Sequence, residues 1–241
     1  MATIAFVPAR SGSVGIPGKH VRSFCGQPLI RWVVGALEGA RDVDRVVVAT
    51  DCEDVAHVVS ESDHDKAEVF WRSPASACDT ASPEAVILEF LWRDAVEDND
   101  VFVLAHATSP FTSSSDFNAA LTRFTEGSMD SLVSVVEHRR YLWSEGGTPV
   151  NFELANRPRR QDHRGGLMEN GAFYISRAGA IRESQSRVSG VIEPYVMPAY
   201  TGIEIGEEAD WITAEALMEW LGSGQSEYPD PALSQLALTS R

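Results

Sequence analysis

Cysteine is scarce in this sequence, and long hydrophobic runs are missing. The three cysteines, Cys25, Cys52 and Cys78, form no CxxC motif and no Cys/His pair with zinc spacing, so we expect reduced thiols. No apolar run approaches the roughly 18 residues that a membrane span needs, and no basic region precedes an apolar core near the N-terminus. We therefore expect a cytoplasmic protein without a membrane partner.

Positive charge is also in short supply. The 241 residues include 20 Lys and Arg against 35 Asp and Glu, which gives a formal net charge of −15. This balance argues against nucleic-acid binding, which requires a basic face. Any site for an anion must then be locally basic, so each cation in a glycine-rich loop is informative. The length suits one large domain or a domain with an appendage.

Continuous apolar runs alternate with amphipathic segments along most of the chain. Continuous runs indicate strands that are buried on both faces, as in a parallel sheet covered by helices. The sequence therefore predicts an α/β fold with a doubly wound, mainly parallel sheet. The expected strands are 3–9, 44–51, 67–72, 100–110 and 130–138, and the expected helices are 28–40, 53–62, 82–96 and 113–127.

The alternation stops between residues 138 and 169. This segment is polar, rich in Gly and Arg, and holds aromatics at irregular spacing, which is typical of either a surface arm or an inserted hairpin. Strand-like and helical segments then return, at 171–181, 192–199, 201–206 and 207–221. We expect one domain over residues 1–222 that includes this arm, followed by a loose tail over 223–241.

A glycine-rich loop follows the first expected strand and carries two cations, Arg10 and Lys19. In open α/β sheets, ligands bind beyond the carboxyl ends of the strands, where this loop begins. Glycines let main-chain N–H groups approach a phosphate, Arg binds phosphate oxygens in a fork, and Lys adds a mobile charge. The alternative is a mobile crossover loop with solvated cations. The loop matches neither GxGxxG nor GxxxxGK[ST].

Longer motifs extend the pattern. The segment "VPARSGSVGIPGKHVRSFCGQPLI" is followed in order by "VVVATDCEDVA", "RSPASACDTASPEAVI", "ATSPFTSSSDF", "RRQDHRGGLMENGAFYI" and "IEIGEEAD". Together they resemble the CMP-sialic acid synthetase (acylneuraminate cytidylyltransferase) family over about residues 3 to 218. The resemblance implies a Rossmann-like nucleotidyltransferase fold and a homodimer formed through the arm.

The resemblance also implies a reaction. An anionic oxygen of the acceptor attacks the α-phosphate of CTP, pyrophosphate leaves, and Mg²⁺ (or Mn²⁺) neutralises the developing charge. The substrates would be CTP and a small anionic acceptor, such as an acid sugar. The residues that match the family's motifs are, for catalysis, Arg10 and Lys19; for the nucleotide, Ala9, Arg10, Ser11, Gly12, Lys19, Arg72, Thr80 and Ser82; for the acceptor, His106, Thr108, Ser109, Arg160, Asn170, Gly171 and Phe173; and for the metal, Glu204.

Several of these residues also have purely structural interpretations. Ser82 suits the N-cap of the helix that follows it, and residues 107–110 suit a turn between strand and helix. Phe173 suits the core of a strand. Glu207 and Glu208 suit the first turn of a helix, where acids favour the dipole.

Five positions depart from the family's pattern: Val14 stands for a Lys, His20 for an Asn, His106 for a Gln, Met168 for an Arg and Gly206 for a metal-binding Asp. These changes leave the acceptor open among nonulosonates, octulosonates and small phosphonates. They also leave open a nucleotide-binding homologue that has lost catalysis, and an enzyme that uses another nucleoside triphosphate.

Overall fold

The computed structural model describes residues 1–12, 15–61, 65–78 and 80–223. Its main feature is a seven-stranded sheet with the strand order β5-β4-β1-β6-β8-β7-β9. The strands of this sheet are β1 (Thr3–Pro8), β4 (Arg45–Thr50), β5 (Ala67–Trp71), β6 (Val101–Ala105), β7 (Ser131–His138), β8 (Gly166–Arg177) and β9 (Ile192–Met197). The helices are α1 (Leu29–Glu38), α2 (Glu53–Ser60), α3 (Pro74–Ala77), α4 (Pro83–Arg93), α5 (Ser114–Glu126), α6 (Ala178–Ser184) and α7 (Glu208–Gly222), with a 3₁₀ turn η1 (Ala199–Gly202).

The sheet is mainly parallel, as the apolar runs predict. Strand β1 pairs in parallel with β4 and β6, β4 pairs in parallel with β5, and β7 pairs in parallel with β9. Strand β8 is antiparallel to both of its neighbours, β6 and β7. It can take this direction because β7 and β8 form a long hairpin, and an antiparallel pair needs no crossover helix.

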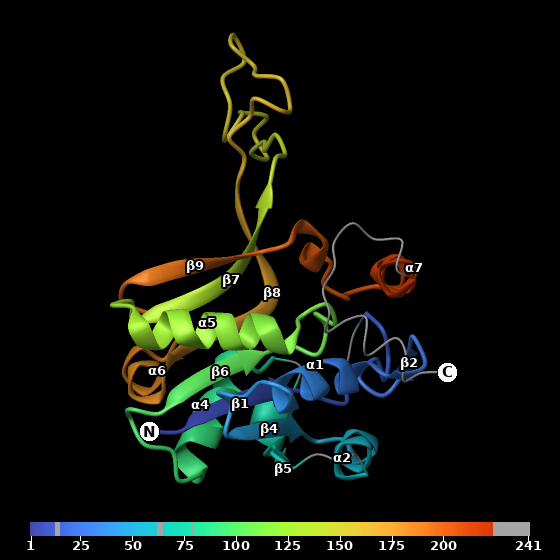
Figure 1. Cartoon of the computed structure of the whole chain (residues 1–241), viewed down its shortest axis with the longest axis vertical. Coiled ribbons are helices and arrows are strands. Elements are labelled where there is room, and N and C mark those ends of the chain that lie inside the picture. Colours follow the sequence, from blue (N-terminus) through green and yellow to red (C-terminus); the bar gives the residue numbers. More distant parts are fainter. Residues whose placement is uncertain (13–14, 62–64, 79, 224–241) are drawn as a thin grey trace.

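Helices cover both faces of the sheet, which explains the continuous apolar strands. Alternate residues of β1 divide between the two sides: Ala5 and Val7 pack with α1, α2 and α5, whereas Ile4 and Phe6 pack with α4 and α6. In Figure 1, α5 and α1 lie in front of the strands.

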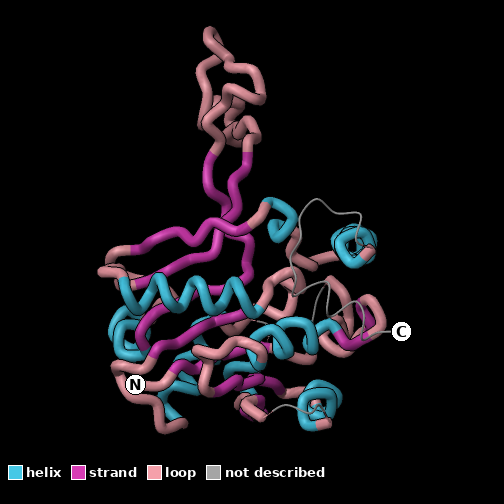
Figure 2. The backbone as a smooth tube through the Cα atoms, in the orientation of Figure 1, coloured by secondary structure: helices cyan, strands magenta, loops and turns pink. Residues whose placement is uncertain are grey.

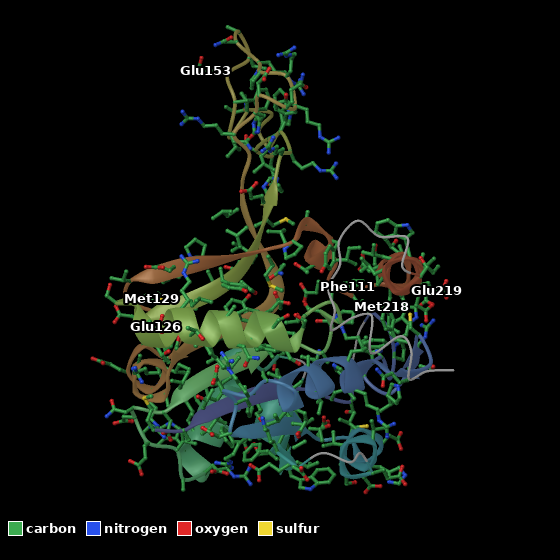
Figure 3. All side chains as sticks on the ribbon, in the orientation of Figure 1. Phe111, Glu126, Met129, Glu153, Met218 and Glu219 are labelled. Carbon is green, nitrogen blue, oxygen red and sulfur yellow. The ribbon has the colours of Figure 1, made fainter. Side chains whose placement is uncertain are left out.

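A third apolar cluster joins α7 to the body. Trp211 packs edge-on against Phe24, with ring centroids 5.5 Å apart, and Phe111 and Met218 belong to the same cluster (Figure 3). Phe24 lies in a small ribbon that the sequence did not predict, formed by β2 (Ser23–Phe24) and β3 (Gln27–Pro28). This cluster holds α7 beside the loop that follows β1.

The arm consists of residues 139–165 at the tip of the β7–β8 hairpin. Figures 1 and 2 show it projecting far from the sheet, with β7 and β8 rising into its base. It has a small aromatic cluster of its own, in which Tyr141 packs on Phe152 and Arg157 lies 4.1 Å from the Tyr141 ring centre. Residues 166–169, expected in the arm, belong to β8.

Two other expectations need correction or lie outside the described residues. Residues 201–206, expected as strand-like, form the end of η1 and an irregular segment, because Ile205 donates its N–H to the carbonyl of Thr108 (2.8 Å) instead of to a sheet partner. Of the expected tail, only Ser223 lies within the description. No described helix has both the length and the apolar character that crossing a membrane requires.

Candidate functional site

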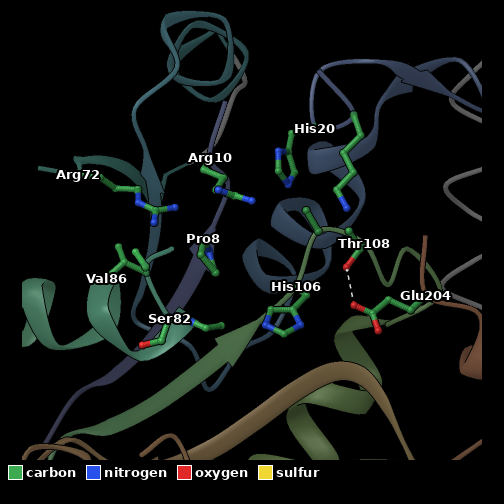
Figure 4. A pocket seen from close by; sticks show the side chains of 13 residues that line it. Pro8, Arg10, His20, Arg72, Ser82, Val86, His106, Thr108 and Glu204 are labelled. Atoms are coloured by element: carbon green, nitrogen blue, oxygen red, sulfur yellow. Dashed lines mark hydrogen bonds between the residues drawn. The ribbon is translucent and has the colours of Figure 1, made fainter. Parts of the chain in front are cut away.

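The carboxyl ends of β1 and β6 open into a pocket of about 340 Å³. Cations, histidines and one acid come to it from separate parts of the chain (Figure 4). The lining residues are Pro8, Arg10, Lys19, His20, Arg72, Ala81, Ser82, Pro83, Val86, His106, Ala107, Thr108 and Glu204. Of the residues predicted from the sequence, the pocket brings together Arg10, Lys19, Arg72, Ser82, His106, Thr108 and Glu204.

Three cations line this pocket although the chain as a whole is acidic. Lys19 is half-buried and donates through Nζ to the carbonyl of Ile205 (3.2 Å). Burial lowers the pKa of Lys19, and the nearby carboxylate of Glu204 opposes that effect. Arg72 donates through Nη2 to the carbonyl of Ser76, while its buried Nε has no hydrogen-bond partner among the described residues. The pocket therefore offers several donors to an anion.

The start of the glycine-rich loop is fastened to the end of β4. Thr50 donates its hydroxyl to the carbonyl of Ala9 (2.6 Å). Asp51 accepts from Ser11 twice, from the main-chain N–H (2.8 Å) and from the hydroxyl (2.7 Å). The Ser11 groups predicted to contact a phosphate are thus bound to a carboxylate. We predicted no role for Asp51, although "ATD" ends an expected strand at the same sheet edge.

The remaining predicted nucleotide residues do not line the pocket. Ala9 is buried, and its N–H donates to the carbonyl of Ala49 (2.9 Å). Gly12 is exposed, and Thr80 is exposed with its hydroxyl 3.4 Å from the Cys78 sulfur. Their place at the ligand stays a prediction.

Ser82 has its predicted capping role and also lies in the pocket wall. It is the N-cap of α4, where its Oγ accepts from the N–H of Ala85 (3.2 Å), and it also lines the pocket. With Pro83 and Val86 it forms a wall that is partly apolar. Ser82 and Val86 lie across the pocket from Glu204 (Figure 4).

His20 is a buried imidazole in the pocket wall, only 7% exposed. Burial lowers its pKa to about 4, and the positive charge of Lys19 acts in the same direction. The main-chain carbonyl of Arg10 partly opposes this shift. His20 is therefore neutral at pH 7.

His106 follows β6 and is also neutral at pH 7. Burial lowers its pKa to about 4, and Arg187 contributes in the same direction. Arg187 donates through Nε to Glu84 at the start of α4 (2.7 Å) and lies 5.1 Å from the Tyr174 ring centre. No sequence signal pointed to this arginine, because it sits in a polar stretch between expected elements.

Thr108, Gly171 and Glu204 come together on the side of the pocket away from Arg72. Thr108 donates its hydroxyl to Glu204 Oε1 (3.3 Å). Gly171 has a positive φ of 66°, and a Cβ at this position would lie 2.8 Å from Glu204 Oε2. The absence of a Cβ at position 171 therefore leaves room for the Glu204 carboxylate.

Three other predicted acceptor residues lie behind the pocket wall. Ser109 donates its hydroxyl to the carbonyl of Asn170 (3.3 Å), and Asn170 donates its amide to the hydroxyl of Thr201 (3.0 Å). Phe173 is fully buried, with its ring centroid 5.2 Å from that of Phe117. These side chains support the strands that form the site.

Arg160 lies in the arm, away from the pocket. It lines a second cavity of about 450 Å³ at the base of the arm, together with Arg140, Met168 and Ile203. The chain's own fold does not bring Arg160 to the other predicted acceptor residues.

Comparison with known proteins shows which family this chain belongs to. The family model described as cytidylyltransferase matches residues 4–192. The chain belongs to the cytidylyltransferase family. The chain is 36% identical over 219 residues to N-acylneuraminate cytidylyltransferase B of Danio rerio, and 37% identical over 221 residues to N-acylneuraminate cytidylyltransferase of Oncorhynchus mykiss. Each match covers 88% of this chain but only 50% and 49% of the relative, so the chain spans about half of their length.

A relative of similar size and two solved structures extend the comparison. The chain is 29% identical to the CMP-N,N'-diacetyllegionaminic acid synthase of Legionella pneumophila, over 91% of this chain and 97% of the relative. A CMP:2-keto-3-deoxy-manno-octonic acid synthetase complexed with CTP has the same fold, with a TM-score of 0.69, 18% identity, and coverage of 91% and 99%. A 4-diphosphocytidyl-2C-methyl-D-erythritol synthase from Anaerococcus prevotii aligns with a TM-score of 0.65, 11% identity, and coverage of 90% and 96%.

Within the cytidylyltransferase family, the departures predicted from the sequence fall at different places. His20 and His106 line the pocket, whereas Met168 is 44% exposed near the base of the arm. Val14 lies outside the described residues. Gly206 offers only its main chain, whose N–H donates to Asp210 (3.0 Å).

The carboxylates near the pocket are few. Of the described residues in its lining, Glu204 is the only acid. Asp210 accepts from the N–H groups of Gly206 (3.0 Å) and Glu207 (2.9 Å), and so caps α7. Among the described residues, no three His, Cys, Asp or Glu side chains group closely enough to hold a metal ion.

Proposed function

We propose that this chain is a CTP-dependent cytidylyltransferase, which couples CTP to a small anionic acceptor and releases pyrophosphate. The observation that carries the proposal is the pocket at the strand ends of a cytidylyltransferase-family sheet, where Arg10, Lys19 and Arg72 converge. Three cations in one pocket of a chain with a net charge of −15 indicate a polyanionic ligand.

The shape of the pocket suggests how CTP would lie. Arg10 and Lys19 come from the loop that follows β1, whereas Ser82 and Val86 come from α4 and lie beside Arg72, across the pocket from Glu204 (Figure 4). We assign the cationic side to the triphosphate and the wall of α4, with Arg72, to the nucleoside, which needs an apolar surface and a few oriented polar groups. The neighbouring octonic acid synthetase structure, which contains CTP, supports a nucleotide in this fold.

The residues present fit a divalent cation that is bound partly by the substrate. Mg²⁺ usually keeps several waters and binds one or two carboxylates together with substrate phosphates, rather than a cage of protein ligands. Glu204 supplies one carboxylate beside Lys19, and Thr108 holds one of its oxygens. We therefore assign Mg²⁺ (or Mn²⁺) to Glu204. When bound, the ion would neutralise charge on the phosphates.

The chemistry requires positioning and charge stabilisation, and no covalent intermediate on the protein. An acceptor oxygen forms a bond to the α-phosphorus while the bond to the bridging oxygen of the β-phosphate breaks, and pyrophosphate leaves. Arg10 and Lys19 stabilise the charge that develops on the phosphate oxygens. When the nucleophile is a hydroxyl rather than an ionised oxygen, its proton passes to water or to one of the neutral imidazoles in the pocket, that of His20 or that of His106.

The acceptor would enter on the side of His106, Thr108 and Glu204. Arg160 reaches this side only if it comes from another molecule, because in its own chain it lines the cavity at the base of the arm. We therefore infer a homodimer in which the arm of one copy approaches the pocket of the other. The acceptor is an acid sugar or a related small acid. Gly206, which offers no carboxylate, favours the alternative of a nucleotide-binding homologue without catalysis.

The test measures pyrophosphate release with each of the four nucleoside triphosphates, Mg²⁺, and a panel of nonulosonates, octulosonates and small phosphonates. Lys19→Ala should lower kcat/KM by about 10²-fold or more without unfolding the protein, as expected when one charge-stabilising donor is removed. Lys66→Ala is the matched control, since Lys66 Nζ also donates to a main-chain carbonyl, that of Ala40 (2.8 Å), but lies outside the pocket.

Activity with CTP that survives in Lys66→Ala and falls in Lys19→Ala would support the proposal. Unchanged turnover in Lys19→Ala would remove Lys19 from the mechanism. CTP binding without turnover of any acid in the panel would favour the non-catalytic alternative.

A further inference from the structure

The short turn that follows Arg72 sets the direction of its guanidinium group. The residue comes directly after β5, where its N–H donates to the carbonyl of Thr50 (3.0 Å). Its guanidinium Nη2 donates to the carbonyl of Ser76, at the end of the same turn. The place of this carbonyl therefore decides where the guanidinium points within the pocket.

The turn cannot hold its own position. Helix α3 has only four residues, and isolated helices this short are unstable in water. Its N-cap, Ser73, makes no side-chain capping hydrogen bond. The exposed main-chain donors at the start of the turn must then be satisfied from outside.

Glu89 supplies the missing partner from the neighbouring helix α4. Its carboxylate accepts from the N–H of Ser73 through both oxygens (2.9 and 3.3 Å) and from the hydroxyl of Ser76. Arg93, one turn along α4, donates to the same carboxylate (2.5 Å) and to the carbonyl of Trp71 (3.1 Å). The Glu89 side chain is only 12% exposed.

The carboxylate is held in its charged form. Burial alone would raise the pKa of Glu89, but the donors from Ser76, Arg93 and Ser73 together lower it. A charged acceptor makes stronger hydrogen bonds than a neutral one. Both ends of the turn, at Ser73 and Ser76, are therefore bound firmly to α4, which also carries Ser82 and Val86 to the pocket.

We infer that Glu89 is a positioning residue for nucleotide binding, which fixes the Ser73–Ser76 turn and so directs the Arg72 guanidinium to acceptor groups of the nucleoside. This inference rests on the proposed function. Glu89 lines no part of the pocket and touches no substrate. Its effect must therefore pass through Arg72, whose Nε is buried and without a hydrogen-bond partner among the described residues.

The test is a double-mutant cycle on CTP affinity, measured by isothermal titration calorimetry with Mg²⁺ and no acceptor. Glu89→Ala should weaken CTP binding by about 10-fold in the wild-type background, and by no more than about 2-fold in the Arg72→Ala background, because residues that act through each other are not additive. Glu89→Gln keeps one oxygen acceptor and should weaken binding less than Glu89→Ala.

Steady-state kinetics add a second measurement. A residue that positions a ground-state contact should raise KM for CTP and leave kcat within about 2-fold, whereas a general loss of folded protein lowers kcat alone. Glu68→Ala is the matched control. It removes a carboxylate from β5 that pairs with Arg45 (2.5 Å), and Arg45 keeps its second partner, Asp94 (3.1 Å).

Coupling between Glu89 and Arg72, with Glu68→Ala at wild-type affinity, would support the inference. Equal weakening by Glu89→Ala in both backgrounds, or no weakening in the wild-type background, would overturn it. If Glu89→Ala does not fold, Glu89→Gln carries the same cycle. A wild-type chain that binds no CTP would instead overturn the proposed function itself.

Discussion

Acid should destabilise this protein through two histidines of the pocket. Burial lowers the pKa of both His20 and His106 from 6.5 to about 4. The positive charge of Lys19 adds to this effect at His20, and that of Arg187 adds to it at His106. Between pH 4 and pH 6.5, each of these two histidines binds a proton in the unfolded chain but not in the folded chain. The free energy of unfolding therefore falls as the pH falls through this window, and it is fully retained above pH 6.5.

The magnitude follows from the size of the pKa shift. One pKa unit corresponds to about 1.36 kcal/mol, and pH 5 lies about 1.5 units below the ordinary histidine value. Each imidazole should then remove about 2 kcal/mol of stability at pH 5, or about 4 kcal/mol for the pair. That is a large share of the roughly 5–15 kcal/mol that stabilises a typical domain.

Urea unfolding, followed by tryptophan fluorescence at pH 8, 7, 6 and 5, would measure this loss. The comparison is with His20→Asn/His106→Gln, which carries at both positions the neutral amides that the family resemblance implies. The two proteins have the same carboxylates and differ only at positions 20 and 106, so the difference between the two pH profiles reports the imidazoles. The double variant should keep about 4 kcal/mol more of its pH 8 stability at pH 5.

His57→Gln is the control, because the His57 side chain is 68% exposed. Its profile should follow that of the wild type. Parallel profiles for wild type and double variant would refute the reasoning, since they would mean that the two imidazoles take up protons equally in the folded and unfolded states.

Two further substitutions test the acidic side and the helix that bounds the pocket. Gly171→Ala should lower the free energy of unfolding by about 1–3 kcal/mol and lower Mg²⁺-dependent turnover, because φ is 66° and the new Cβ would lie 2.8 Å from Glu204 Oε2. The control is Gly35→Ala, inside α1 with open space around it. This substitution should raise the free energy of unfolding by up to about 1 kcal/mol in urea. Ser82→Ala should lower stability by about 1 kcal/mol through loss of the α4 N-cap, whereas Ser82→Asn should restore most of it; equal stability of the three proteins would contradict the capping role.

Much of the fold was predictable because burial on both faces leaves a clear trace in the sequence. The runs at β1, β4 and β6 are apolar at nearly every position, and all three are parallel neighbours in the sheet. The same trace says nothing of direction, so the antiparallel course of β8 could not be predicted. The two-residue strands around Gly26 are too short to show any period.

Site residues could be predicted where the residue type alone indicates the ligand, as a cation in a glycine-rich loop does. Contacts between residues far apart in the sequence could not be predicted. Arg10 and Lys19 in a glycine-rich loop indicated an anion site, and both line the pocket. The contacts that position such groups join residues far apart in the chain, such as Ser11 with Asp51, or Arg187 with Glu84. No local spacing in the sequence predicts these pairs, because only the folded sheet brings the two residues of each pair together.

The two pocket histidines bear on what the acceptor is. Where the family resemblance implies amides at positions 20 and 106, this chain has imidazoles that burial keeps neutral at pH 7. The exchange therefore alters the volume and the hydrogen-bonding directions of the pocket wall, but it adds no positive charge. Because the His106 imidazole is neutral at pH 7, it offers no positive charge to a second anionic group on the acceptor, and it therefore gives no support to a phosphonate over a carboxylic acid. The kcat/KM values of different acceptors should therefore depend on acceptor shape rather than on acceptor charge. A panel of monocarboxylic sugar acids that differ in chain length but carry the same charge tests this specificity most directly.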